Sequence, residues 1–260
     1  MGEAKSRKAR FLAANPICCY CGSSPSTEED HCPARICFRE KVGPDGWSFP
    51  SCSACNRAIS GTEQVVAFYI RALDHTDENY READIQRLTA GIRNNAPEVF
   101  PKLDQSAAEK RRMMADLGIQ RTPGVFLSDE PVLPIPAGID RHFEYFARKL
   151  TAALFYRNNG RSLTESHFVM NQWFQTQSGT LADVLETLAP VWNRTLIGSR
   201  PNLDFGDQLS IVIGTAHDSD VFTYVAQFGT SLCFWGGAGK PENEEQHPGW
   251  KSYRPIKDGI

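Results

Sequence analysis

The sequence predicts an α+β fold that begins with a small, cysteine-organised module, and three observations carry this prediction. Seven of the eight cysteines lie between Cys18 and Cys55. The middle of the chain has the apolar periodicity of helices, and residues 209–235 alternate apolar segments with turn residues, as strands do. We expect three parts: the cysteine module at 1–75, a helical connector with a proline-rich linker at 76–135, and a small α+β domain at 136–260.

Length and charge limit the classes of protein to which the chain can belong. With 260 residues and 41% apolar content it can bury a substantial core. The formal charge of −3 excludes a generally basic nucleic-acid binder, so any nucleic acid must be held by a local basic surface. Residues 1–57 carry eight Lys and Arg against six Asp and Glu. No long apolar run or signal peptide is visible, so we expect a cytoplasmic protein without membrane contact.

Helix signals recur from the N-terminus to the middle of the chain. Residues 3–14 predict a short basic helix that ends before Pro16. Ser60 and Glu63 have the spacing of a capping box, and the apolar spacing that follows predicts a helix at about 61–74. Paired charges predict two further helices at 77–93 and 104–117. The proline-rich segment 122–138 argues against regular structure, and we place the domain boundary there.

The second half predicts both helices and strands. Amphipathic spacing predicts helices at 139–157 and 164–174, and a third at about 180–189. Apolar segments separated by turn residues predict strands at 209–214, 221–228 and 231–235. The glycine-rich run 236–240 follows a strand but leads into Pro241 and acidic residues, so it is a weak match to a phosphate-binding loop.

Two Cys-x-x-Cys pairs form the strongest local signal. Cys18 with Cys21 and Cys52 with Cys55 supply four thiolates, the ligand set of a tetrahedral structural Zn²⁺. Cys19 is an alternative to Cys18, although two residues between ligands is the spacing that lets a tight turn present both sulfurs to one ion. Unrelated thiols in a reducing compartment are the other interpretation.

The segment between the two pairs carries a second signal. Asp30-His31 precedes Pro33, and Asn56 directly follows Cys55. This order and spacing resemble the zinc-stabilised ββα-metal core of HNH endonucleases, a treble-clef module, over residues 16–70. By position, the resemblance implies that Asp30 and Asn56 bind a catalytic Mg²⁺ or Mn²⁺ and that His31 is the general base. It implies hydrolysis of phosphodiester bonds in nucleic acid, DNA in the first place.

The chemistry of these residue types agrees with the implied roles. Carboxylate and amide oxygens are hard ligands suited to Mg²⁺ or Mn²⁺, whereas thiolates suit zinc. A neutral imidazole can accept a proton from attacking water near pH 7. Neighbouring residues on a strand face opposite sides, so Asp30 and His31 can serve one site only if the strand ends or bends there.

The sequence departs from the HNH pattern in two places, and other functions stay open. The middle Asn or His has no counterpart in residues 46–51, so a backbone carbonyl would have to orient His31, and the Lys expected soon after Asn56 is missing. The alternative is a zinc finger that binds nucleic acid or protein without catalysis. The second half has no catalytic motif that we recognise, so a protein partner could bind there. The candidate phosphate contacts are Arg35, Arg39, Lys41 and Arg57.

Overall fold

The computed structural model describes residues 2–73, 82–102, 104–116, 118, 124, 126, 134–175, 203–215, 222–229, 232–240 and 251–259. Within these ranges the chain has the expected mixture of helix and sheet, with five helices and two sheets. None of the helices described there is both long enough and apolar enough to cross a membrane.

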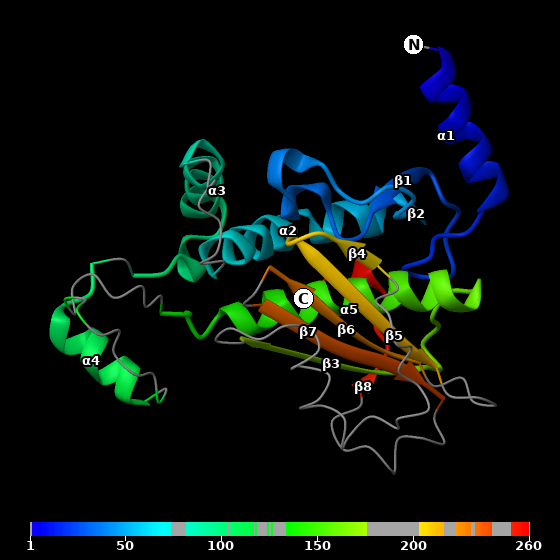
Figure 1. Cartoon of the computed structure of the whole chain (residues 1–260). Helices are drawn as coiled ribbons and strands as arrows, with labels where there is room; N and C mark the ends of the chain where they lie inside the picture. Colours follow the sequence, from blue (N-terminus) through cyan, green and yellow to red (C-terminus); the bar gives the residue numbers. More distant parts are fainter. Residues whose placement is uncertain are drawn as a thin grey trace.

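A β-hairpin followed by a helix forms the N-terminal module. β1 (Glu28–His31) pairs antiparallel with β2 (Ser48–Ser51), and α2 (Ser53–Leu73) begins two residues after β2 ends. The connection between the two strands holds the short helices η1 (Arg35–Cys37) and η2 (Arg39–Lys41). α1 (Gly2–Ala14) precedes the hairpin and extends away from the rest of the chain (Figure 1).

The helix after the hairpin begins earlier than the capping box predicts. α2 starts at Ser53, and Ser60 lies inside it, where its hydroxyl donates to the Arg57 carbonyl. The backbone N–H of Cys55 instead donates to Cys52 Sγ at 3.5 Å, so a thiol of the second cysteine pair takes the place of an N-cap side chain. The predicted start at residue 61 was therefore wrong, because the helix already begins at the turn formed by Cys52 and Cys55.

The middle helices are close to their predicted ranges. α3 (Glu82–Asn95) corresponds to the helix predicted at 77–93, and α4 (Ala107–Asp116) corresponds to the helix predicted at 104–117. The short helix η3 (Pro97–Val99) lies between them. α3 packs on α2, whereas α4 stands apart from the other elements in Figure 1.

The second half is built on a six-stranded antiparallel sheet. Its strands lie in the order β4-β5-β6-β7-β3-β8, and the short helix η6 (Ile256–Asp258) follows the last of them. The strands are β3 (Phe168–Gln175), β4 (Leu203–Phe205), β5 (Leu209–Thr215), β6 (Phe222–Phe228), β7 (Leu232–Gly239) and β8 (Lys251–Ser252). The three predicted strands correspond to β5, β6 and β7.

Two further predictions in this half are tested by the described residues. The helix expected at 164–174 was wrong: residues 168–175 form β3, paired along their whole length with β7. Pairing with a neighbouring strand outweighs a short helical pattern. The glycine-rich run lies largely in β7, where a Cβ on Gly236 would come within 2.6 Å of the Tyr224 ring. The glycines thus permit close packing in a strand. The helix expected at 180–189 lies outside the described residues.

One long helix joins the sheet to the N-terminal module. α5 (Ile139–Asn159), close to the range predicted for it, runs between the sheet and α2 in Figure 1. Phe143, Phe146 and Leu150 are buried, and both phenylalanines contact Phe234 of β7. A single cluster of buried apolar residues extends from Cys18 to Ile256. The described parts of the module and of the second half therefore share one core.

Candidate functional site

The four cysteines of the two pairs lie together. Cys18, Cys21, Cys52 and Cys55 are buried, and their Sγ atoms are all within 4.8 Å of one another. Four sulfurs bound to zinc at ~2.3 Å in a tetrahedron are roughly 3.8 Å apart, so the cluster fits the ion after a small contraction. The four cysteines could hold a metal ion such as zinc, and the cluster contains Cys18 and not Cys19.

Backbone geometry brings the first cysteine pair into this position. The N–H of Cys18 donates to Ser24 O at 2.9 Å, and the N–H of Gly22 donates back to Cys18 O at 2.9 Å. Gly22 has a φ of 63°, in the left-handed region that glycine adopts without strain. The resulting turn directs Cys18 and Cys21 toward the start of α2, where the second pair lies.

The thiols of the cluster differ in their pKa values. Cys55 donates a hydrogen bond to Cys18, which lowers the pKa of Cys18 to about 5 and raises that of Cys55. In Cys21, burial is outweighed by hydrogen bonds from Ser23 and Ser24, which lower the pKa of that thiol. The cluster therefore presents thiolate to a cation at neutral pH. Cys32 and Cys37 are buried outside the cluster, and burial raises their pKa values, as expected of inert apolar thiols.

Asp30 points into the interior. Only 9% of the residue is exposed, and its Oδ2 accepts a hydrogen bond of 2.8 Å from the Tyr20 hydroxyl. Lys149 Nζ of α5 lies 2.7 Å from the same oxygen. No described residue donates to the other oxygen, Oδ1. One half of the carboxylate is thus fixed by the protein, and the other half has no partner in the described part of the chain.

Lys149 is shared between two carboxylates. It is completely buried, and its second partner is Glu63 of α2, whose Oε1 lies 2.5 Å from Nζ. Burial alone would lower the pKa of Lys149, but Glu63 and Asp30 together raise it well above its ordinary value. Lys149 is therefore an ammonium group, whereas burial raises the pKa of its partner Glu63.

His31 is the last residue of β1 and is partly exposed. Burial, and then the charge of Arg35, lower the pKa of its imidazole, while Asp30 and Glu29 act in the opposite direction. The Trp47 backbone also raises the pKa of the ring, by less than these charges do. β1 ends at His31, the strand end that a joint site with Asp30 requires. The ring is largely neutral at pH 7.

Asn56 lies in the first turn of α2, directly after Cys55. Its Nδ2 donates to Glu28 Oε2, and Ser53 Oγ donates to the other carboxylate oxygen, Glu28 Oε1, at 2.7 Å. These hydrogen bonds lower the pKa of Glu28. In the described residues the Asn56 side-chain oxygen has no hydrogen-bond donor. Glu28 therefore fixes the amide by its nitrogen.

The four candidate phosphate contacts differ in their surroundings. Arg39 is tied to the turn between β4 and β5, through Asp207 and through Gln208 Oε1, which accepts its backbone N–H at 2.8 Å. Arg35, Lys41 and Arg57 are exposed. Arg39 is thus engaged within the chain, while the other three present their charge to solvent.

The residues that surround Asp30 form no motif in the sequence. Lys149 and Glu63 are charged residues on the apolar faces of two amphipathic helices, and this position is the signal that could have identified them as a buried pair. Tyr20 is fully buried, and its hydroxyl donates a hydrogen bond to Asp30. Trp47 is also buried, with the guanidinium carbon of Arg157 4.5 Å from the centre of its ring. Both aromatics therefore belong to the core.

Known proteins give no further guide to the site. No family model matches the sequence, and neither a curated protein nor a solved structure matches the chain.

Proposed function

We propose that the N-terminal module is a zinc-stabilised, metal-dependent endonuclease of the HNH type, which hydrolyses phosphodiester bonds in nucleic acid, preferentially DNA. One observation carries the proposal. Asp30 and Asn56 are each fixed through one side-chain atom and keep an oxygen that no described residue engages. These are the two oxygens that the resemblance assigns to a catalytic cation.

Each residue of the site would have its own role in the proposed reaction. Asp30 Oδ1 and the Asn56 amide oxygen would hold Mg²⁺ or Mn²⁺, which supplies charge stabilisation at the scissile phosphate and the leaving oxygen. His31 would take the proton from the attacking water, since its lowered pKa keeps the ring neutral. Zinc at the four cysteines would hold the start of α2, and with it Asn56, in place.

Lys149 and Tyr20 act as positioning residues in this proposal. A metal-binding carboxylate is commonly held through its second oxygen by a neighbouring donor, which fixes its orientation. Both contacts of Asp30 are to Oδ2. Asp30 Oδ1 would therefore be left for the divalent cation.

The burial of Asp30 favours a second candidate function, a zinc module that binds nucleic acid without cutting it. A carboxylate that is 9% exposed and paired with a buried ammonium already has a cation beside it. In that case Asp30 would be structural, and the exposed Arg35, Lys41 and Arg57 would supply the binding surface.

Plasmid cleavage by the full chain separates the two functions. With Mg²⁺ or Mn²⁺ we expect the wild type to cut, and His31→Ala to cut more slowly by roughly 10²–10⁴-fold, the usual contribution of a positioned base. Asp30→Asn should lose activity that high Mn²⁺ partly restores. Glu29→Ala is the matched control, because Glu29 directly precedes Asp30 on β1; measured well above the pKa of His31, it should change the rate little.

Zinc content and DNA affinity are measured on the same samples. The nuclease proposal requires both to be unchanged in His31→Ala. If the wild type binds zinc and DNA but cuts with neither metal, the binding module is the correct function. If His31→Ala cuts as fast as the wild type, His31 is not the base.

A further inference from the structure

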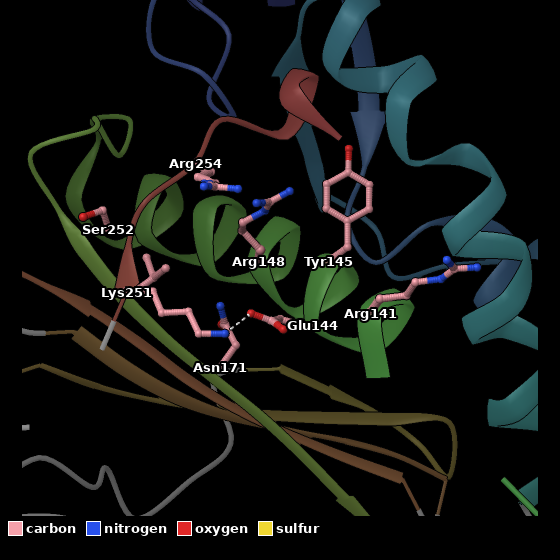
Figure 2. A pocket seen from close by; sticks show the side chains of 9 residues that line it. Arg141, Glu144, Tyr145, Arg148, Asn171, Lys251, Ser252 and Arg254 are labelled. Atoms are coloured by element: carbon pink, nitrogen blue, oxygen red, sulfur yellow. Dashed lines mark hydrogen bonds and ion pairs between the residues drawn. The ribbon is translucent and has the colours of Figure 1, made fainter. Parts of the chain in front are cut away.

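A pocket of about 550 Å³ lies between α5 and the edge of the large sheet. Its lining includes Tyr145 and Arg148 of α5, Asn171 of β3 and Arg254 after β8 (Figure 2). The volume is within the ~300–1,000 Å³ usual for sites that bind small organic molecules. Its lining includes none of the proposed nuclease residues, so the inference below does not depend on that function.

Positive charge predominates in the lining. It contains one carboxylate, Glu144, which lies 2.6 Å from Lys251 Nζ. Arg141 is paired with Glu98, outside the pocket, at 2.7 Å. Among the described residues no carboxylate forms an ion pair with the two remaining cations, Arg148 and Arg254.

These two arginines lie close to each other. Both line the same pocket, and Figure 2 draws them in the same part of it. Burial lowers the pKa of Arg148, and the charge of Arg254 adds to that effect, as expected for neighbouring cations. The Arg148 guanidinium carbon is 4.7 Å from the centre of the Tyr145 ring, and its Nη2 donates to the Gly259 carbonyl. Arg148 is thus held in place beside a second positive charge, and no described carboxylate forms an ion pair with it.

We propose that this pocket binds a phosphate-bearing ligand and that Arg148 and Arg254 bind its phosphate group. The planar guanidinium fork matches two phosphate oxygens, and two such groups balance the charge of a monophosphate. Asn171 and Ser252 add polar groups, while Tyr145 and Val169 offer an apolar wall to the rest of the ligand. Two kinds of ligand carry a phosphate group of this chemistry: a free, nucleotide-sized metabolite and the backbone of a nucleic-acid strand.

Calorimetric titration of the full chain, without divalent metal, tests the pocket. The probes are AMP, adenosine and a short oligothymidylate. Arg254→Gln removes an exposed cation of the pocket, and Arg148→Gln removes the partly buried one. Lys257→Gln is the matched control, because Lys257 is an exposed cation of η6 that does not line the pocket.

We expect AMP to bind, adenosine to fail, and Arg254→Gln to weaken AMP by about tenfold or more, as for a lost charged hydrogen bond. Lys257→Gln should bind as the wild type does. If only the oligothymidylate binds, with the same dependence on Arg254, the phosphate belongs to a nucleic acid. The proposal is overturned if no phosphate-bearing probe binds, or if Arg254→Gln and Lys257→Gln have equal effects. Because cleavage is not measured, failure of the nuclease proposal would leave this result unaffected.

Discussion

Single side chains connect the two halves of the chain around Asp30. Lys149 comes from α5 and reaches Asp30 of β1 and Glu63 of α2, with no part of its surface exposed. Such a triad is rarely a large net source of stability, because removing three charges from water offsets most of their attraction. We expect its larger effect to be on specificity, because Asp30 and Glu63 meet the same ammonium group only when β1, α2 and α5 are packed in this arrangement.

Removing Lys149 should therefore be costly. Lys149→Met leaves Asp30 and Glu63 buried without their cation, and we expect a loss of about 3–5 kcal/mol in the free energy of unfolding. Urea denaturation of the full chain measures it. Lys251→Met is the control, because its exposed pair with Glu144 should contribute about 1 kcal/mol or less. Equal losses in the two variants would show that the buried triad is not coupled to stability.

The lowered pKa of His31 predicts a pH dependence for cleavage. The base must be neutral, so the rate should fall as the pH drops through the pKa of His31, below its ordinary value of 6.5. The positive charge of Arg35 is one cause of the lowering. Arg35→Gln should therefore raise the pKa and move the acid limb of the pH–rate profile to higher pH.

Arg57→Gln is the control for this shift. The charge of Arg57 acts on Glu28, so its loss should leave the acid limb in place. Identical acid limbs in Arg35→Gln, Arg57→Gln and the wild type would show that the titrating group is not His31.

At the scale of elements, the four cysteines decide where the hairpin and α2 meet. Cys52 follows β2 directly, and its sulfur accepts the Cys55 N–H in the first turn of α2. A metal at this point would fix the hairpin to the helix, because the binding free energy of a structural zinc contributes to folding.

We expect Cys55→Ser to release zinc and to open the hairpin, since three thiolates bind the ion far more weakly than four. Zinc content per chain and the rate of proteolysis within residues 16–52 measure the two effects. Cys37→Ala should keep its zinc, because Cys37 lies outside the cluster. Purified wild-type protein without zinc would contradict the metal site itself.

At the scale of the whole molecule, the described parts of the two halves form one body. Contacts between them include Tyr253 Oη to Tyr20 O, Ser162 Oγ to Cys18 O at 3.2 Å, and Arg157 Nη1 to Gly46 O at 3.0 Å. The apolar core is continuous across the same boundary. α5 thus has one face on the sheet and another on the N-terminal module.

This shared core changes what we expect of a truncated chain. Residues 136–260 alone would expose the face of α5 that carries Lys149, so we expect no cooperative unfolding transition from this fragment in urea. Co-expression with residues 1–135 should restore the transition, because it returns the missing partners. A fragment that unfolds cooperatively by itself would instead establish the proline-rich segment as a true domain boundary.

The sequence by itself determined the local features. The spacing of the cysteine pairs predicts the cluster, and helical periodicity predicts α1 and α5 closely. Apolar segments between turn residues predict β5, β6 and β7. The helices and strands could be predicted because they depend on residues that are near one another in the chain. The cysteine cluster could be predicted because four thiolates form a specific ligand set, although the two pairs are distant in sequence.

Only the tertiary structure decided the remainder. β3 became a strand because β7 lies beside it, although its own residues also fit a helix. Lys149 meets Asp30, and Arg148 meets Arg254, because α5 packs against other elements on several sides. Sequence patterns report the preferences of neighbouring residues, whereas the environment of a buried charge depends on which distant surfaces meet. For that reason the partners of Asp30 and the basic pocket could be found only in the folded chain.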